Sequence, residues 1–213
     1  MDRRTEITWI SAAKILSLLI FSFLLAMAID SVSVFAKECA DIRSSVLRLH
    51  ILANSDTEED QRTKLKVRDR ILQETESLFY WSDGLRMAKQ KARASLPRIE
   101  KIAAEELRRL GKNDTVHAEL IHMFFETRVY ERFTMPAGYY DAVRVTIGKA
   151  KGKNWWCVLY PPLCVPAASS EEELARTLTH GQREIVESKP QYEIRFYAIE
   201  LFEKAKEFFT QQK

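Results

Sequence analysis

Cysteine and histidine are the residue types in this chain that most readily act as nucleophiles or metal ligands. A catalytic thiol needs a histidine and a group that orients it, and no histidine stands in a recognisable motif with Cys157 or Cys164. His117 and His122 are five residues apart in a predicted strand, so their side chains point to opposite faces. The sequence has no paired-cysteine and no His-Glu-x-x-His spacing. We therefore expect no catalytic residues, no metal site and no cofactor.

Cys157 and Cys164 could form a disulfide in an oxidising compartment, because only six residues separate them. The alternative is two buried thiols, since cysteine is among the most buried residue types. The residues leave both interpretations open. Cys39 would be the odd cysteine, either free or paired with another molecule.

Three lysines lie in the segment that joins two predicted strands. Lys149, Lys151 and Lys153 are accompanied by two glycines that permit a tight turn, so we predict a hairpin loop over residues 148–153. Three ammonium groups at a loop tip could dock on an acidic protein surface or on anionic lipid headgroups. The alternative is a hairpin tip whose charges only keep it in solvent.

Trp155 and Trp156 follow this loop directly, after Asn154. Adjacent residues of a strand point to opposite faces, so one tryptophan should fill the core. The other lies under a helix or is exposed as an anchor for a partner protein, where tryptophan is enriched. Burial of both is the alternative, because the strand is apolar on both faces.

The first predicted strand covers residues 46–53, where apolar residues alternate with Arg48 and His50. This alternation indicates a half-buried strand whose polar side chains point outward. Asn54 begins the turn that ends it. We therefore place the outward groups of this strand, together with the lysine loop and the tryptophans, in one candidate partner surface: Arg48, His50, Asn54, Lys149, Lys151, Lys153, Asn154, Trp155 and Trp156.

Two helical stretches follow the first strand. The first ends near residue 80 and begins at a capping box in one of two registers, Ser55 with Glu58 or Asp56 with Glu59. The second covers residues 85–110 and ends at Gly111, a typical C′ residue. Pro97 lies inside the second stretch and predicts either a kink or two separate helices.

The period changes to two after residue 115, which predicts three strands, at 116–120, 143–147 and 155–160. The last is apolar on both faces and so is central or covered. A short helix capped by Ser169 or Ser170 should close near Gly181. Residues 192–209 have mostly helical spacing, although their start would also pass as a strand. The predicted fold is α+β, a small, mostly antiparallel sheet with helices packed on one face.

The N-terminus has the three parts of a secretory signal. Basic residues precede an uncharged apolar run over residues 15–29, and small or compact residues precede a possible cleavage after Ala36. The run spans about 22 Å as a helix, less than a hydrocarbon core of roughly 30 Å, which favours a cleaved signal peptide. The alternative is an uncleaved anchor, which would leave the protein associated with the membrane. Either way, the basic flank predicts export of the remainder.

The rest of the chain, residues 37–213, suits a single domain with a substantial core. We divide it into a core over residues 40–165 and a helical extension over residues 166–213. The whole chain has a charged fraction of 30% and an apolar fraction of 46%, which are those of an ordinary folded protein. A net charge of +3 does not indicate a nucleic-acid partner, for which a strongly basic patch is expected.

Three stretches together resemble the stage II sporulation protein R family of endospore-forming bacteria. They are the strand and turn at residues 47–56, the helical segment at residues 64–69, and the block of residues 136–164 that holds the lysine loop and both tryptophans. The resemblance covers about residues 40–165.

This resemblance implies a non-catalytic signalling protein of sporulation. Members of the family are made in the forespore and exported into the space between the two membranes. There they activate a membrane-embedded aspartic protease, which processes the precursor of sigma-E. A protein of this kind needs no small-molecule substrate. The alternative hypothesis from the residues is an exported hydrolase that acts on cell wall or peptide through Cys157 or a carboxylate pair.

Overall fold

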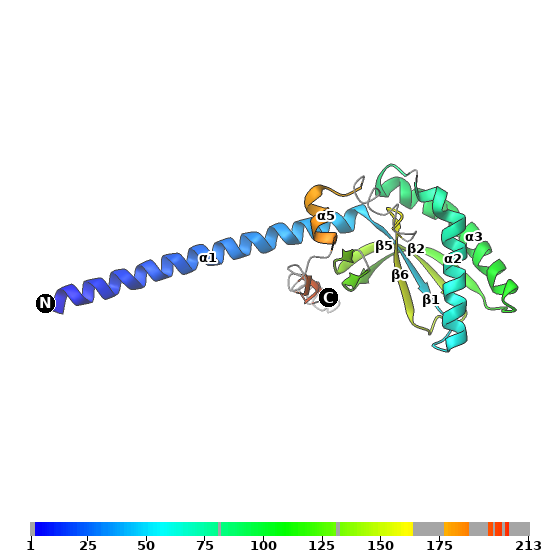
Figure 1. Cartoon of the computed structure of the whole chain (residues 1–213), viewed down its shortest axis with the longest axis horizontal. Coiled ribbons are helices and arrows are strands. Elements are labelled where there is room, and N and C mark those ends of the chain that lie inside the picture. The colour runs from blue at the N-terminus through cyan, green and yellow to red at the C-terminus, as the bar shows by residue number, and fades with distance from the viewer. Residues whose placement is uncertain are drawn as a thin grey trace, which may run out of the picture. The chain divides into compact units, whose positions relative to one another are not determined.

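The computed structural model describes residues 3–80, 82–130, 133–163, 177–187, 196–197, 199–201 and 203–204. Two compact units make up the chain, Met1–Cys39 and Ala40–Lys213. The first unit is part of α1 (Arg3–Ser45), a single helix that continues through Asp30 and past Ala36. The second unit holds the sheet and the other helices (Figure 1).

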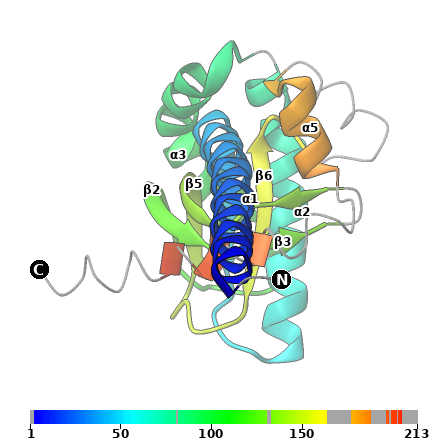
Figure 2. The ribbon, with the colours of Figure 1, turned by 90° about the vertical axis from the view of Figure 1, so that its left-hand side faces the viewer.

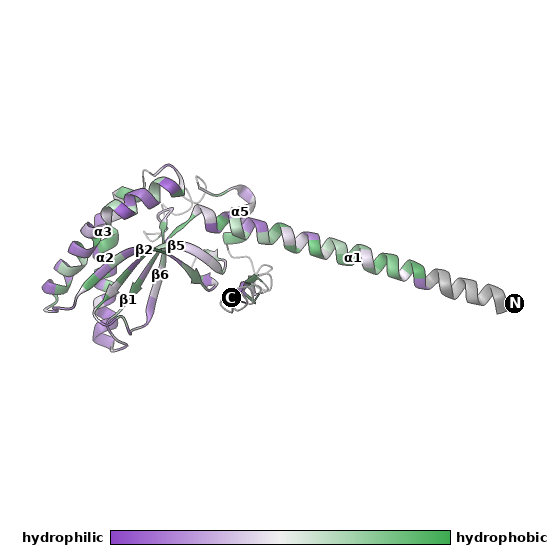
Figure 3. Ribbon diagram, turned by 180° about the vertical axis from the view of Figure 1, so that it is seen from behind, coloured by the Kyte–Doolittle hydropathy of each residue, from purple (hydrophilic) through white to green (hydrophobic). Residues whose placement is uncertain are grey.

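The apolar side chains of α1 are exposed along its length, from Ile15 to Val34. Figure 3 shows this stretch in the colours of apolar residues. By length and composition the segment Lys14–Ser45 could cross a membrane, because about 20 apolar residues suffice. The helix is longer than the uncharged run that predicted it, so its length no longer favours a cleaved signal over an anchor. An apolar N-terminal helix is thus confirmed, and cleavage after Ala36 stays a prediction.

A four-stranded sheet with the order β2-β5-β1-β6 forms the centre of the second unit. Its strands are β1 (Leu47–Leu52), β2 (Val116–Phe125), β5 (Gly138–Ile147) and β6 (Asn154–Tyr160). The β2–β5 and β1–β6 pairs are antiparallel, whereas β1 and β5 are parallel. A separate small sheet joins β3 (Arg128–Val129) to β4 (Thr134–Met135). The predicted α+β class with a mostly antiparallel sheet is confirmed.

The predicted β5–β6 hairpin is wrong, because β1 lies between these two strands. A six-residue connection is long enough either for a hairpin between β5 and β6 or for a crossover past β1. The burial of β1 on both faces favours the crossover. Five of its six residues are buried, as expected of a strand inside a sheet. β6 is therefore an edge strand with covered faces. Of the two predicted alternatives, a covered strand is right and a central strand is wrong.

Helices α2 (Glu58–Tyr80) and α3 (Gly84–Arg109) pack against one face of the sheet (Figures 1 and 2). Alternate residues of β1 and an apolar stripe on each helix meet in the main core, as their periods require. Its central members are Leu47, Leu49 and Ile51 of β1, Val67, Ile71 and Phe79 of α2, and Ile99, Ala103 and Leu107 of α3. Helices on one face of the sheet were predicted and are observed.

The helix ends confirm one prediction and correct two. Gly111 has a φ of 72°, and the Lys112 N–H donates to the Leu107 carbonyl over 2.9 Å, which is the expected glycine C-cap. Pro97 does not divide α3, so two separate helices are wrong. Neither proposed capping box forms, because Thr57 caps α2 by accepting a hydrogen bond from the Asp60 N–H.

Helix α5 (His180–Val186) begins at a capping box formed by Thr179 and Gln182. Gly181 lies in the first turn of α5, whereas Thr177 is helical and Leu178 is not, so a preceding helix ends four residues before this glycine. Ser169 and Ser170 lie outside the described residues, as does the start of the predicted C-terminal helix. The described residues at 196–197, 199–201 and 203–204 are helical, as predicted for the tail.

Candidate functional site

Residues 148–153, here called the crossover loop, carry the chain from β5 over the end of β1 to β6. The Lys151 N–H donates to the Asn54 carbonyl over 3.2 Å, and the Gly152 N–H donates to the Ala53 carbonyl over 2.9 Å. These bonds tie the loop to the backbone that leaves β1. The loop is therefore fixed at two points that the sequence places about a hundred residues away.

Side chains from the β1–α2 turn add further bonds to the crossover loop. The Asn54 Oδ1 accepts from the Lys149 N–H over 2.9 Å, and the Asp56 Oδ1 accepts from the Lys153 N–H over 2.5 Å. The ammonium of Lys64, on α2, donates to the Lys153 carbonyl over 2.8 Å. Backbone donors and acceptors of the loop are thus satisfied by turn and helix residues, which limits its motion.

The Asp60 carboxylate fixes Asn54, the turn residue that binds the crossover loop. This carboxylate accepts from the Ser55 hydroxyl over 2.6 Å and from the Asn54 amide over 3.0 Å. The hydrogen bond from Ser55 is the largest influence on its pKa, and the overall effect of its surroundings lowers that pKa below the ordinary value. Asn54 is consequently held from both ends, by Asp60 at its amide nitrogen and by Lys149 at its amide oxygen.

Both glycines of the crossover loop are required by this close approach. A Cβ atom on Gly152 would overlap the carbonyl oxygen of Ser55, which is backbone and cannot turn away. Gly148 has a φ of 56°, and a Cβ there would overlap the side chain of Asn54. The glycines therefore let one loop lie directly on another.

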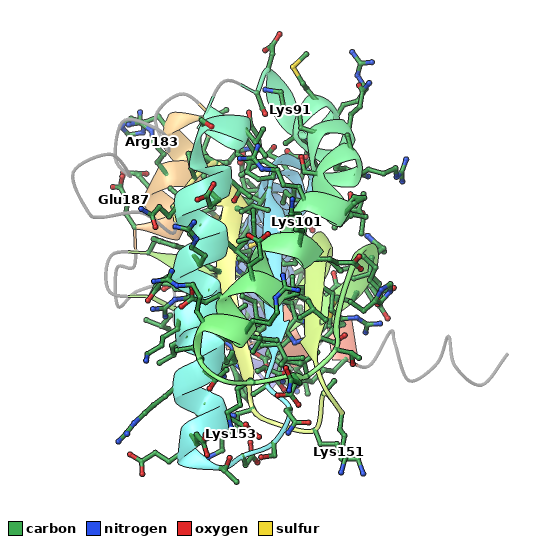
Figure 4. All side chains as sticks on the ribbon, turned by 90° about the vertical axis from the view of Figure 1, so that its right-hand side faces the viewer. Lys91, Lys101, Lys151, Lys153, Arg183 and Glu187 are labelled. Carbon is green, nitrogen blue, oxygen red and sulfur yellow. The ribbon has the colours of Figure 1, made fainter. Side chains whose placement is uncertain are left out.

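The lysine side chains of the crossover loop point into solvent. Lys149, Lys151 and Lys153 are all exposed. Figure 4 shows Lys151 and Lys153 at the same end of the molecule, beyond the ends of the strands. The structure thus brings Asn54 and the three lysines together, although by a crossover and not by the predicted hairpin. The result is a fixed backbone that presents three positive charges.

Arg48 and His50 do not belong to an exposed surface, which corrects the prediction that they point outward. Their exposed fractions are 0% and 3%. They do lie on the face of β1 opposite the main core, but aromatic side chains cover that face as well. Phe125 of β2 and Trp156 of β6 pack around them. Alternation of polar and apolar residues therefore predicted the two faces of the strand but not their exposure.

His50 is held as a neutral ring between β1 and β6. Its ring stacks on Trp156 at a centroid distance of 3.9 Å, and its Nε2 lies 2.8 Å from the Asn154 Oδ1. Burial lowers the pKa of His50 to about 4, and the positive charges of Arg144, Arg48 and Lys64 act in the same direction. Asn154 is exposed, but its amide oxygen is engaged by this histidine.

The Arg48 guanidinium is buried among aromatic rings. Its carbon lies 4.3 Å from the Phe125 ring centroid and 5.0 Å from that of Tyr140. One nitrogen donates to the Tyr130 hydroxyl over 2.6 Å, whereas Nε and the other terminal nitrogen have no hydrogen-bond partner among the described residues. Burial raises the pKa of Tyr130, so this hydroxyl stays neutral, and among the described residues no carboxylate forms an ion pair with Arg48.

Trp155 and Trp156 point to opposite faces, as predicted. Trp155 packs against the main core and under the Arg68 guanidinium, which lies 4.8 Å from its ring. Trp156 lies on the other face, beside His50 and Phe125. Both rings are partly exposed, so neither full burial of both nor one freely exposed anchor describes them.

Of the two cysteines predicted to pair, Cys157 lies among the described residues. Cys157 is 5% exposed and faces the main core, but Cys164 lies outside the described residues. Cys157 is disulfide-bonded, and its pairing with Cys164 stays a prediction. Among the described residues no group of three or more metal-binding side chains comes together.

A second basic region was not part of the predicted site. Helix α3 carries five basic residues, Arg86, Lys89, Lys91, Arg93 and Arg98, before its first carboxylate at Glu100. A hollow of about 820 Å³ opens beside them, between α3 and Ser44. The run of basic residues is visible in the sequence, but the hollow depends on how the end of α1 meets α3.

The stage II sporulation protein R family model matches residues 43–170. This match covers more than half of the chain and includes the whole sheet, so the protein belongs to that family. Stage II sporulation protein R of Bacillus subtilis strain 168 is 37% identical over 123 residues, which are 58% of this chain and 55% of the relative. The chain thus aligns with about half the length of that relative. No solved structure matches.

Proposed function

We propose that this protein is an exported signalling protein of sporulation that binds and activates a membrane-embedded aspartic protease, which then processes pro-sigma-E. Membership of the stage II sporulation protein R family over residues 43–170 is the observation that carries this proposal. The action is non-catalytic and takes place between the forespore and mother-cell membranes. Helix α1 serves as the export signal or as the membrane anchor.

The crossover loop supplies a surface suited to this task. Its backbone is fixed by bonds to Ala53, Asn54, Asp56 and Lys64, so little conformational entropy is lost when a partner binds. Its three exposed lysines favour an acidic partner surface and speed its encounter. Trp155 and Trp156, at the start of the next strand, add partly exposed aromatic area beside the loop.

An activator that only binds must prefer the active arrangement of its target. Turning a protease from mostly inactive to mostly active requires several kcal/mol of such preference. A single exposed ion pair contributes at most about 1 kcal/mol. Several charges on a rigid loop, with aromatic contacts beside them, are therefore needed, and the crossover loop presents that combination.

Co-production in a foreign host tests the proposal. The protease and its pro-sigma substrate are made with and without this chain, and cleavage of the substrate is followed on immunoblots. We expect cleavage only when the chain is present. Unchanged cleavage in its absence would contradict the proposed function.

A charge-reversed loop tests the surface itself. Lys149→Glu, Lys151→Glu and Lys153→Glu together should lower processing at least about tenfold, by replacing attraction with repulsion. The matched control is Lys66→Glu, Lys101→Glu and Arg108→Glu, three exposed basic residues on the helices. Equal loss in both variants would show a general effect of charge and would remove the loop from the binding surface.

A further inference from the structure

An open groove lies at the end of the sheet opposite the crossover loop. It consists of two neighbouring hollows of about 820 and 580 Å³ that share Ser44 and Leu85. Arg86, Lys89 and Arg93 of α3 line the larger hollow. Figure 4 shows Lys91, from the same half of α3, far from Lys151 and Lys153 of the crossover loop. The groove is therefore a separate surface.

The smaller hollow already has its charges paired. The Asp141 carboxylate lies 2.6 Å from the Lys89 ammonium and 3.1 Å from the His122 ring. The Arg43 guanidinium lies 3.2 Å from the Glu203 carboxylate and donates to the Ala137 carbonyl over 3.0 Å. A ligand in this half would meet a nearly neutral, polar wall.

The larger hollow is different, because Arg86 and Arg93 are exposed and have no carboxylate partner among the described residues. Arg86 also stands in the first turn of α3, where the helix dipole disfavours a positive charge. That turn has no acidic residue and no side-chain cap at Asp83. Helix stability does not explain this placement of charge, whereas an anionic ligand would benefit from both the arginines and the dipole.

We propose that this groove binds an acidic, extended segment of a partner protein. That the ligand belongs to a partner protein rests on the proposed function. That the ligand is acidic rests on the groove alone. The two arginines are seven residues apart on one helix, which is about 10 Å along the axis. An extended segment in the polyproline II conformation covers about 9 Å in three residues and returns every third side chain to the same side. The ligand therefore carries acidic residues three positions apart.

A polypeptide fits the groove better than an anionic lipid surface does. Lipid headgroups present a broad layer of negative charge, but the smaller hollow, in which Asp141 and Glu203 are already paired with cations, offers little attraction to it. A segment of polypeptide can place acidic side chains beside Arg86 and Arg93 and neutral ones beside Tyr139, whose side chain is 40% exposed. The mixed lining thus favours a ligand with patterned charge.

A fluorescent peptide tests the inference directly. A labelled peptide of Glu-Gly-Gly repeats is titrated against the full chain in neutral maltoside micelles, and its anisotropy is measured. We expect saturable binding that Arg86→Glu with Arg93→Glu weakens at least about tenfold. A peptide of the same composition with all glutamates adjacent should bind less tightly. Absence of binding by the repeat peptide would overturn the proposal.

A matched pair on the same helix is the control. Lys101→Glu with Arg108→Glu changes two exposed cations at the same seven-residue spacing and the same net charge, away from the groove. This pair should weaken binding less than about threefold. Arg86→Gln with Arg93→Gln, which adds no carboxylate, should also weaken binding and guards against misfolding of the reversed variant. Equal losses in the groove and control pairs would overturn the proposal.

Two further outcomes separate this inference from the proposed function and from a lipid ligand. If processing of pro-sigma-E depends on the chain but the peptide does not bind, the groove inference is wrong and the proposed function stands. If the peptide binds but processing does not depend on the chain, the proposed function is wrong and the groove stands. Displacement of the peptide by micelles that contain phosphatidylglycerol would assign the groove to lipid and overturn the inference.

Discussion

The two faces of β1 are both buried over residues 47–51 but are built from different chemistry. Leu47, Leu49 and Ile51 face the helices and meet aliphatic side chains, whereas Arg48 and His50 face aromatic rings on the other side. On the first face, burial stabilises the fold in proportion to the apolar area removed from water. On the second, part of that gain offsets the desolvation of polar groups that have incomplete partners. Equal burial therefore does not mean equal contribution to stability.

The largest effect should come from the aliphatic face. Leu49→Ala removes a fully buried side chain between Val143 and Cys157, and the cavity should lower the free energy of unfolding by about 3 kcal/mol. Urea denaturation of the full chain in neutral micelles, followed by circular dichroism, measures this change. A loss below about 1 kcal/mol would break the comparison, because the aliphatic face would then not dominate stability.

The aromatic face should respond to acid through His50. Its pKa is about 4 in the fold and 6.5 in the unfolded chain, so the unfolded state binds a proton more readily between these values. The corresponding stability is fully present above about pH 6.5 and is lost as the pH falls toward 4, by at most about 3 kcal/mol. Urea denaturation at several pH values measures the loss.

Two variants show whether His50 is responsible for that acid sensitivity. His50→Phe should flatten the decline between pH 6.5 and 4, because the ring that must remain neutral is gone. His117→Gln, at an exposed histidine, should leave the decline unchanged. The same decline in wild type and in His50→Phe would assign the effect to other groups.

Arg48 should contribute little to stability despite its complete burial. Arg48→Met replaces the guanidinium by an apolar chain of comparable length, and the free energy of unfolding should change by about 1 kcal/mol or less. The reason is that the desolvated charge has a single hydrogen-bond partner among the described residues. A loss of 3 kcal/mol or more would indicate a buried ion pair and would contradict the comparison.

The smallest effect concerns the edge of the aliphatic face. Arg68→Gln removes the guanidinium above Trp155 and should lower stability by about 0.5 kcal/mol, with a shift in tryptophan fluorescence. Arg62→Gln, on the exposed surface of the same helix, should change neither quantity measurably. Identical spectra for Arg68→Gln and wild type would show that this contact does not persist in solution.

Local sequence patterns predicted the helices and strands. The features that they did not predict depend on pairing between strands that are distant in the sequence. The alternation in β1 and the seven-residue spacing in α2 depend on neighbouring residues, so both elements were predictable. The place of β6 beside β1 depends on residues about a hundred positions away, and no local pattern encodes it. The burial of Arg48 was missed for the same reason, because Phe125 covers it from a distant strand.

The candidate site was predictable to a similar extent. The lysines and Asn54 were both singled out, but their contact follows from the crossover, which the predicted hairpin excluded. The groove beside α3 was missed although its signal was present, since five basic residues precede the first acidic one in that helix. A charge run that opposes the helix dipole indicates function more clearly than one that agrees with it.

The central position of β1 has a consequence for when the domain can fold. A polypeptide leaves a ribosome or a translocation channel with its N-terminus first, and the partners of β1 emerge only with residues 138–160. Until then this strand has no neighbour, so the sheet cannot close on a partly emerged chain. The sheet therefore closes only after β6, which ends at Tyr160, has emerged.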